Sequence, residues 1–509
     1  MGRRRAFEVR GATGPMISSG HPGSAAATAG PRSAGYQMML TALLSLNFGI
    51  VLFDRNALGF LMPFIQPELA LTNTQVGLLS SGLSLTWAIA AFGIGVVADK
   101  FGSRKKLLVL STVIFALCSF GSGLATSFAM MLVARLVMGA AEGGIMPISQ
   151  SMIATDVSPR HRGLAMGIAQ GFGSSLMGSF VAPVLLVAFA TSFGWRASFF
   201  LAGVPGILTA LLMAWLIRER RVAAMAPMAL AAPSDPVAPV GSVAPTEPVV
   251  PVGSVVSAEP MAPVASVARA EPVIHAANES EGAATRATAG SRREVLRDRN
   301  ITLCALLGVL LVSYLVVCWA FMPLYLTQER HYEPSTMGWL MGTLGISATI
   351  ASSAIPALSD RIGRRPPMIL MPLIAIVLPL AALYFTGPVW MLAAIFFVGW
   401  GVTGVFPLFM ATVPSESVDA RHMATALGIC MGTGEILGGV FSPSLAGYAA
   451  DRVGLQAPLW MMAGLALVAT LLALGLRETA PRVLGERALC SPFGGREDSQ
   501  NVASGFERR

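Results

Sequence analysis

About twelve apolar runs, each near the length of a membrane-spanning helix, fall into two groups of six along the chain. A helix rises about 1.5 Å per residue, so about 20 residues cross the hydrocarbon core of a bilayer. The first group lies within residues 36–217 and the second within residues 299–477. Charged residues make up only 12% of the chain, whereas about 25% is usual in soluble domains. The sequence therefore predicts an all-α membrane protein with two six-helix bundles.

The basic residues of the loops predict how these helices are oriented. Lys and Arg gather in alternate loops, as in the segment from Lys100 to Lys106 and again around Arg160 and Arg162. The positive-inside rule then places both termini and the connection between the bundles in the cytoplasm, most simply of a bacterial inner membrane. The net charge of +8 is explained by this orientation, and no nucleic-acid partner is predicted.

Three segments lie outside the two bundles. Residues 1–35 and 478–509 are polar, and we expect them to be disordered cytoplasmic tails. Residues 218–298 contain a twelve-residue repeat that begins at Pro236, Pro248 and Pro260. Frequent proline prevents regular helix or sheet, so this segment is predicted to be an extended cytoplasmic linker. A binding role for the repeat is the less favoured alternative.

Two charged residues interrupt the fourth apolar run, at about residues 130–154. Arg135, Gly139 and Glu142 are spaced i, i+4 and i+7, so they share one face of a helix. A charged side chain at the bilayer centre costs roughly 2.5–3.5 kcal/mol, so this face is not expected to contact lipid. It either forms a structural ion pair or belongs to a substrate and proton site, and the second interpretation is favoured for ionisable groups within the membrane.

The first run contains a second group of polar residues. Counting residues from the ends of the runs, we expect Asp54 in this run and Glu142 in the fourth run to lie near the middle of the membrane. Asn47 lies seven residues before Asp54 and shares its helix face. Asp54 and Arg55 are adjacent, so their side chains point about 100° apart. One of them is expected to face the fourth run and the other a cavity.

Polar and aromatic residues in later runs are further candidates. Gln170 in the fifth run would either bind substrate hydroxyls or bridge helices. Glu435 in the eleventh run would be a second proton site, a substrate-specificity group or a buried neutral acid. Candidate cavity-lining residues are Tyr314, Trp319 and Tyr325 in the seventh run and Trp400 and Thr403 in the tenth. For the aromatic residues near Tyr325, a belt at the membrane interface is the favoured alternative.

The two groups of runs repeat one loop pattern. After the second run the sequence reads Gly95-Val-Val-Ala-Asp99-Lys-Phe-Gly102-Ser-Arg104, and after the eighth it reads Pro356-Ala-Leu-Ser-Asp360-Arg-Ile-Gly363-Arg364. The same spacing at the same place in each half indicates an internal duplication. A helix that simply ends in charged residues would explain the basic residues, but not why aspartate and glycine have the same spacing in both loops.

These loops resemble the signature of the major facilitator superfamily, over the whole chain except the tails and the linker. The resemblance implies the major facilitator fold, in which two six-helix bundles are related by pseudo-symmetry. In that family the loop is a latch that caps a helix end and bonds across the two halves in one access state. The implied latch residues are Asp99, Gly102 and Arg104, and more weakly Asp360, Gly363 and Arg364.

Other segments are similar to the anion:cation symporters of that superfamily, which carry sugar acids, other carboxylates and related organic anions. They are Phe53 to Leu58, Arg135 to Pro147, Phe193 to Arg196 and Phe321 to Leu326. The resemblance implies proton-coupled symport by alternating access, with Asp54 and Glu142 as proton-coupling acids and Arg55 and Arg135 as anion-binding residues. It implies a monomer whose partners are a small organic anion, protons and the lipid bilayer, with no cofactor besides the proton gradient.

Two alternatives differ from this prediction. The same fold would serve an anion exchanger or exporter, in which Arg135 binds the anion without net proton flow. A membrane sensor with the linker as its output is less favoured, because it would not need protonatable groups inside the membrane. The sequence contains no nucleophile–base set, nucleotide loop or metal cluster, so we predict no enzyme activity.

Overall fold

The computed structural model describes residues 33–218, 298–480 and 482–483, apart from residues 102, 159–160, 170–172 and 419–421. The predicted tails and linker therefore lie outside the described residues, except for a few residues at their edges. Within the described ranges all regular secondary structure is helical. Eleven helical stretches there are long and apolar enough to span a membrane, and α2 (Asn73–Phe101) adds a further helix of 29 residues.

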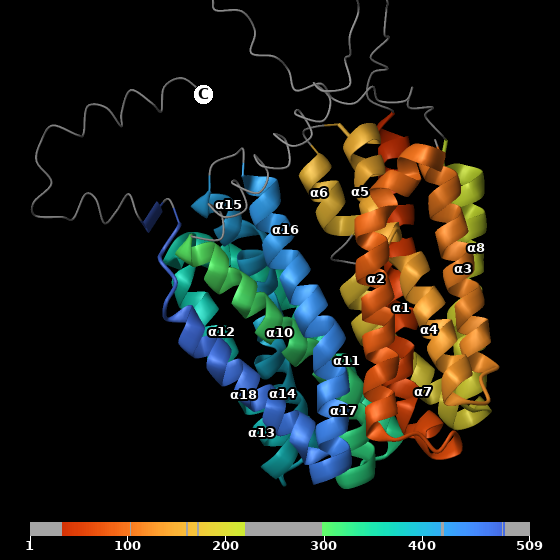
Figure 1. Ribbon diagram of the computed structural model, residues 1–509, viewed down its shortest axis with the longest axis vertical. Helices are drawn as coiled ribbons and strands as arrows, with labels where there is room; N and C mark the ends of the chain where they lie inside the picture. Colours follow the sequence, from red (N-terminus) through yellow and green to blue (C-terminus); the bar gives the residue numbers. More distant parts are fainter. Residues whose placement is uncertain are drawn as a thin grey trace, which may run out of the picture.

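The N-terminal half contains six long helical stretches, drawn in red to yellow-green in Figure 1. They are α1 (Ala34–Glu68), α2, α3 (Arg104–Gly123), α4 with α5 (Phe128–Glu142 and Ile145–Asp156), α6 with η2 and α7 (Arg162–Gly167, Ser174–Val181 and Ala182–Phe193), and α8 (Trp195–Leu216). Buried side chains such as Phe115 and Met213 form the core between them.

The C-terminal half has six corresponding stretches, drawn in green to blue. They are α10 with η3 (Arg299–Leu324 and Tyr325–Glu329), α11 (Pro334–Ile362), α12 with α13 (Arg365–Ala375 and Val377–Tyr384), α14 with η4, η5 and α15 (Val389–Gly399, Trp400–Val405, Leu408–Thr412 and Val413–Ser417), α16 with η6 and α17 (Met423–Thr433, Gly434–Phe441 and Ser442–Val453), and α18 (Gln456–Ala473). The predicted all-α fold with two six-helix bundles is confirmed.

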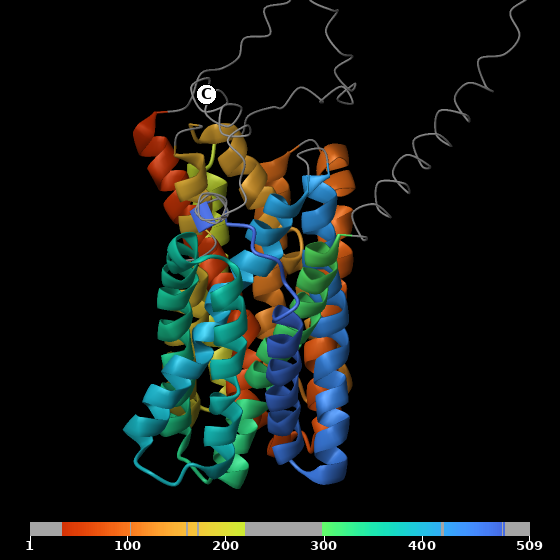
Figure 2. The ribbon, with the colours of Figure 1, turned by 90° about the vertical axis from the view of Figure 1, so that its left-hand side faces the viewer.

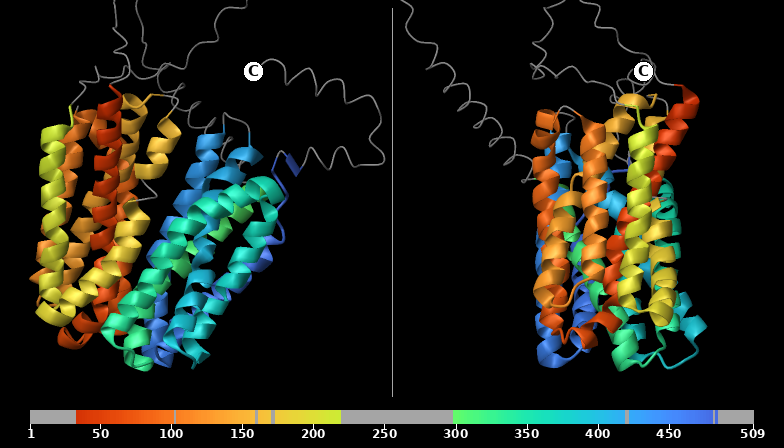
Figure 3. Two further views of the ribbon diagram at one scale, coloured as in Figure 1. Left: turned by 180° about the vertical axis from the view of Figure 1, so that it is seen from behind. Right: turned by 90° about the vertical axis from the view of Figure 1, so that its right-hand side faces the viewer.

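The two bundles lie side by side in Figure 1, and Figure 2, turned by 90°, shows the C-terminal bundle in front of the N-terminal one. The bundles are apart at the end where α1 begins and α8 ends, which we call the terminal end. They meet at the opposite end, which we call the closed end, and the view from behind in Figure 3 shows the same arrangement. At the closed end Gln328 of η3 donates a hydrogen bond to Gln66 of α1 across 2.9 Å.

The closed end also carries a charged contact between the halves. The carboxylate of Asp451 on α17 accepts hydrogen bonds from the backbone N–H groups of Asn73 and Thr74, both at 2.8 Å, and from the Thr74 hydroxyl at 2.5 Å. These two N–H groups begin α2, where a helix has unpaired donors and a favourable dipole for an anion. Asp451 therefore caps a helix of the other half.

Close backbone packing accompanies this cap. At Gly59, Gly77, Gly345 and Gly447 an added Cβ atom would lie only 2.1–2.4 Å from a backbone atom of the other half. Real Cβ atoms do not approach so closely, so each glycine permits an approach that alanine would obstruct. The closed end is therefore held by polar contacts and by glycine-mediated helix packing.

The predicted fourth run is not one continuous helix. It divides into α4 and α5 at Gly143 and Gly144. Pro147 contributes because it has no N–H to donate to the carbonyl group of Gly143. Gly143 also packs against α2, where an added Cβ atom would lie 2.5 Å from the carbonyl oxygen of Trp87. The break places Glu142 at the end of α4, beside α2.

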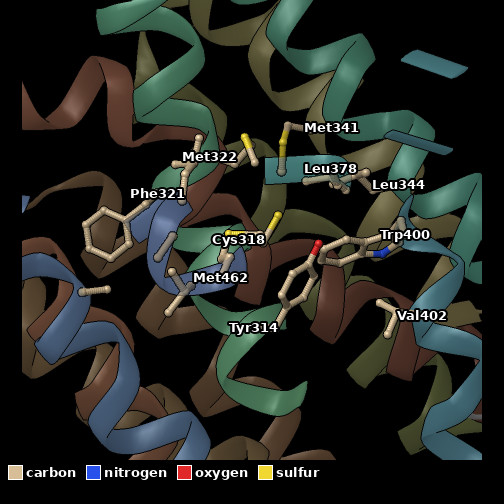
Figure 4. Close-up of a cluster of buried hydrophobic side chains, with 14 of the residues drawn as sticks. Tyr314, Cys318, Phe321, Met322, Met341, Leu344, Leu378, Trp400, Val402 and Met462 are labelled. Carbon is tan, nitrogen blue, oxygen red and sulfur yellow. The ribbon is translucent and has the colours of Figure 1, made fainter. Parts of the chain in front are cut away.

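The core of the C-terminal half supports one wall of the space between the bundles (Figure 4). Tyr314 and Trp400 lie side by side in this cluster, with ring centroids 6.0 Å apart. The Tyr314 hydroxyl donates a hydrogen bond to the carbonyl oxygen of Ala375 at 2.9 Å. Both side chains are almost fully buried, so their packing restricts the movement of α10 and η4, which carry them.

Candidate functional site

A cavity of about 680 Å³ lies between the two bundles. Its lining comes from α1, α2, α4, α5 and η2 of one half and from α10, α11, η4, η5, α16 and η6 of the other. Small-molecule sites usually enclose about 300–1,000 Å³, so this cavity has the size of a ligand site. Of the predicted cavity-lining candidates, Trp319, Trp400 and Thr403 line it. Tyr314 and Tyr325 do not, because both are buried in the core of the C-terminal half.

An ion pair connects α1 and α4 at the edge of this cavity. Nη1 of Arg55 lies 3.0 Å from Oε1 of Glu142, and the two side chains are 23% and 2% exposed. The guanidinium carbon of Arg55 also lies 5.7 Å from the ring centroid of Trp87. Arg55 lines the cavity, so it contacts both the acid of α4 and the space in which a ligand would bind.

Asp54 points elsewhere, as expected for the neighbour of Arg55. Both Asp54 and Arg135 are fully buried, and each exerts an electrostatic attraction on the other. The guanidinium of Arg135 lies 5.4 Å from the ring centroid of Phe199 and forms part of the cavity wall. Arg135 lines the cavity, whereas Asp54 is not among the lining residues.

This charge cluster is incompletely paired. Both carboxylate oxygens of Asp54, Nε and Nη2 of Arg135 and Oε2 of Glu142 are buried without a hydrogen-bond partner in the described part of the chain. An unpaired buried polar atom typically costs about 1–3 kcal/mol, and more when it is charged. A proton or an anionic ligand would reduce this cost, which makes the cluster a candidate functional site.

Asn47, one of the predicted substrate-binding residues, is not among the residues that line the described cavity. Asn47 is fully buried and accepts a hydrogen bond from Thr112 of α3 at 3.3 Å, so its carbonyl group serves helix packing. Gln170 lies outside the described residues, and its predicted role stays a prediction.

Glu435 lies on the opposite wall, in the π-helical segment η6. A Cβ atom added at Gly439 would lie 3.6 Å from both Oε2 of Glu435 and Oγ of Ser84 on α2, which places the carboxylate beside that helix. Glu435 and Arg55 attract each other electrostatically. No hydrogen bond to Glu435 is formed within the described ranges.

The predicted latch residues of the second half contact their own half. Arg364 forms ion pairs with Asp360 and, at 2.9 Å, with Glu416. Gly363 adopts a φ of 104°, and an added Cβ atom would lie 2.4 Å from a carboxylate oxygen of Glu478. Every contact described for Asp360, Gly363 and Arg364 stays within the C-terminal half.

Glu478, which was not predicted, caps the start of α12 in this loop. It accepts hydrogen bonds from the backbone N–H groups of Arg364 at 2.7 Å and Arg365 at 3.1 Å. Partial burial opposes ionisation, but backbone donors, beginning with that of Ala480, hold the pKa of Glu478 below its usual range. The carboxylate therefore stays ionised at neutral pH and is a better cap.

The corresponding loop of the first half is described only in part. Arg104 donates a hydrogen bond from Nη1 to the hydroxyl of Thr155 on α5 at 3.0 Å. Gly102 and the side chain of Asp99 lie outside the described part of the structure, so the latch stays a prediction there.

The sequence contained signals for two features that were not predicted. Ser80, Ser84 and Trp87 are spaced i, i+4 and i+7 on α2, and all three line the cavity. Asp451 lies in Gly447-Tyr-Ala-Ala-Asp451-Arg-Val-Gly454, which repeats the spacing of the loop from Gly95 to Gly102. This third copy ends α17 instead of α2. Within the described residues no group of three or more potential metal ligands occurs.

Two membrane-embedded bundles that enclose a charged, ligand-sized cavity define a membrane transport protein. A sequence model of the Major Facilitator Superfamily matches residues 44–429 and 301–490. The chain belongs to this superfamily, and the protein is an integral membrane transporter and not an enzyme.

Several curated transporters are similar in sequence. A probable 4-methylmuconolactone transporter of Cupriavidus pinatubonensis is 25% identical over 392 residues, which cover 76% of this chain and 78% of that protein. The hexuronate transporter of Bacillus subtilis is 32% identical over 33% of this chain and 39% of its own length. The probable L-galactonate transporter of Escherichia coli is 32% identical over 36% of this chain and 40% of its own length.

Solved structures share the fold. An inward-facing, occupied bacterial homologue of the human lysosomal transporter Spinster aligns with a TM-score of 0.63 at 17% identity, covering 87% of this chain and 97% of that one. The nucleoside transporter NupG aligns with a TM-score of 0.62 at 14% identity, covering 86% of this chain and 98% of that one.

Proposed function

We propose that the protein is a symporter that couples the movement of a small organic anion, a carboxylate such as a sugar acid, to protons by alternating access. The observation that carries this proposal is the ion pair between Arg55 and Glu142 at the edge of the cavity. The names of its relatives, which include hexuronate and L-galactonate transporters, support an anionic substrate.

Arg55 supplies the anion site in this mechanism. Its guanidinium lines the cavity and retains 23% exposure, so an entering carboxylate can form charge-assisted hydrogen bonds with it. The carboxylate then competes with Glu142 for the same cation. Because Glu142 is otherwise buried, losing its partner favours the uptake of a proton on this acid.

The balance of charge in the cluster supports the same coupling. Asp54, Glu142 and Glu435 outnumber Arg55 and Arg135 by one acid, so the fully ionised cluster is already negative. An entering anion adds a second negative charge in a region of low dielectric. Proton uptake by one or more of these acids offsets that cost, and the reverse steps release anion and proton together.

Alternating access follows from the arrangement of the halves. The basic loops support a cytoplasmic position for the terminal end. In this proposal the closed end faces the outside of a bacterial inner membrane, and the cavity opens toward the cytoplasm. The opposite state would require the contacts of Asp451 and of the interface glycines to separate. The loops after α2 and α11 would then be brought toward the other half.

Uptake by purified protein in liposomes tests the proposal. We expect galactonate, glucuronate or sulfoacetate to accumulate when the outside is more acidic than the lumen, and a protonophore to abolish this accumulation. An exchanger without net proton flow would instead depend on anion inside the liposomes and not on the pH gradient. Uptake of none of these anions, and of no aromatic carboxylate, would overturn the proposal.

Replacing Arg55 adds a residue-level prediction. Charge-assisted hydrogen bonds contribute about 1.5–3 kcal/mol, so we expect Arg55→Gln to raise the apparent KM for the anion roughly 10–100-fold. The control is Arg452→Gln, because Arg452 is an exposed cation that lies over Tyr448 outside the cavity lining. Equal KM values in the two variants would contradict the role of Arg55.

A further inference from the structure

The described cavity wall carries charges of both signs on opposite halves. Arg55 and Arg135 come from the N-terminal half, and Glu435 is the one acidic lining residue among those described, from the C-terminal half. Arg55 is hydrogen-bonded to Glu142, and no ion pair or hydrogen bond to Glu435 is formed in the described ranges. The cavity therefore presents an arginine to one side of a ligand and an unpaired carboxyl group to the other.

Helix packing fixes the position of Glu435. It lies in η6, where Gly434 and Gly438 pack closely on α10: an added Cβ atom would lie 3.2 Å from the carbonyl carbon of Gly308 and 2.7 Å from the carbonyl oxygen of Val309, respectively. Such close packing leaves η6 little freedom to turn. π-helical segments of this kind are frequently found at functional sites. The carboxyl group is thus held toward the cavity.

The body of the cavity is aromatic. Trp87 of α2 and Trp319 of α10 are half-buried and line it. The buried Trp400 of η4 supports Trp319, with ring centroids 5.2 Å apart and an interplanar angle of 77°. These faces suit a flat apolar ligand body, and a cation near them gains a further cation–π attraction.

Several polar lining groups are already hydrogen-bonded within the protein. Asn56 donates to the carbonyl oxygen of Gly178 at 2.9 Å, Ser352 to that of Thr349 at 3.2 Å and Thr403 to that of Trp400 at 3.0 Å. Each of these side chains therefore uses a donor hydrogen within the protein, and its oxygen can still accept a hydrogen bond from a ligand. The lining favours an aromatic ligand with charged groups at its ends.

We infer that Glu435 is a specificity-determining residue that binds a protonated amine, so that the preferred substrate is an aromatic carboxylate that also bears an amine. The carboxylate would bind Arg55 and the ammonium group Glu435, with the ring between the tryptophan side chains. This inference rests on the proposed function for the carboxylate at Arg55. Such a substrate has no net charge, so its proton coupling depends on the competition for Arg55 and not on the charge it adds to the cluster. The carboxylate still displaces Glu142 from Arg55, and Glu142 takes up the proton.

Binding of two matched probes to the purified full-length protein tests this assignment. The probes are para-(aminomethyl)benzoate and para-ethylbenzoate, which have the same shape and differ in the charged amine. Isothermal calorimetry would measure both affinities. We expect the amine to improve binding to the wild type about tenfold or more, as for a charge-assisted contact. Glu435→Gln should remove this preference by weakening only the amine probe.

Matched variants separate a charge effect from a general disturbance. Glu435→Asp keeps the charge and should keep a preference for the amine. Glu333→Gln makes the same acid-to-amide change at an exposed residue outside the cavity lining and should not alter the ratio. Binding of para-ethylbenzoate by Glu435→Gln shows that the variant is folded.

Two results would overturn the inference. One is equal affinity of the wild type for both probes, which decides the matter even if Glu435→Gln does not fold. The other is a Glu435→Gln variant that weakens both probes equally, which is expected if the residue serves only as a proton site. Either result leaves the proposed function intact when anions are still taken up with protons. Failure of all anion uptake would instead count against the proposed function.

Discussion

Glu142→Gln is expected to reduce uptake driven by a pH gradient to the rate of protein-free liposomes while preserving counterflow. Glutamine keeps the size and hydrogen-bonding capacity of the side chain, but it does not carry a proton across the membrane. Glu142 is 2% exposed and pairs with Arg55 at 3.0 Å, so it is the acid most directly affected when an anion binds that arginine. Counterflow exchanges labelled for unlabelled anion and needs no net proton transfer.

The measurement compares the two modes of transport in the same preparation of liposomes. Glu333→Gln is the matched control, because it changes an exposed acid to an amide outside the cavity lining, and both modes should persist in it. Loss of both modes in Glu142→Gln would indicate a structural ion pair. Retention of full gradient-driven uptake would exclude Glu142 as the coupling acid.

The second large effect is expected at the closed end, where Asp451→Asn should favour the state that opens toward the outside. The native carboxylate accepts three hydrogen bonds from Asn73 and Thr74 at the start of α2. Asparagine has no charge, and its side-chain NH2 group, itself a donor, would face one of these donors without forming a hydrogen bond. After allowance for solvent screening at this exposed position, we expect a loss of about 1–2 kcal/mol. This corresponds to a roughly 5–30-fold shift in the population of the two states.

Distances between spin labels at the closed end would report the shift. Labels at Thr191 of α7 and Met391 of α14, both exposed, place one probe on each half after the native cysteines are replaced. Ser444→Ala is the matched control, since it removes only a neutral 2.7 Å hydrogen bond to Ser81 across the same interface. Its effect should be small.

Gly77→Ala offers an independent route to the same state. Its Cβ atom would lie 2.1 Å from the carbonyl oxygen of Pro443, so the halves must separate there to accommodate it. If neither Gly77→Ala nor Asp451→Asn lengthens the distance, these contacts do not hold the closed end together.

The fold followed from the sequence because membrane helices leave strong local signals. Apolar runs of fixed length and alternating basic loops define the number and order of the helices without any knowledge of their contacts. The i, i+4, i+7 spacing of Arg135, Gly139 and Glu142 likewise placed all three on a buried face of α4. The break at Gly143 and Gly144 was missed because two glycines and a proline are compatible with a continuous helix in the membrane.

The site was only partly predictable, because its contacts join distant residues. The sequence showed that Asp54 and Arg55 must diverge, but not that Arg55 would be the partner of Glu142, 87 positions away. Asn47 has the same helix phase as Asp54, yet its neighbour is Thr112 of α3. The position of a residue around its own helix gives the direction of its side chain. Which residues lie in that direction depends on how the other helices pack.

The most direct test of the central claim measures proton movement without an imposed pH gradient. Liposomes that hold the protein and a lumenal pH dye would receive galactonate, glucuronate or sulfoacetate on the outside, whichever anion the uptake measurements show to be carried. We predict that the lumen acidifies as the anion enters, and that protein-free liposomes and the Glu142→Gln variant show no such change. Entry of the anion through the wild-type protein at constant lumenal pH would contradict proton coupling.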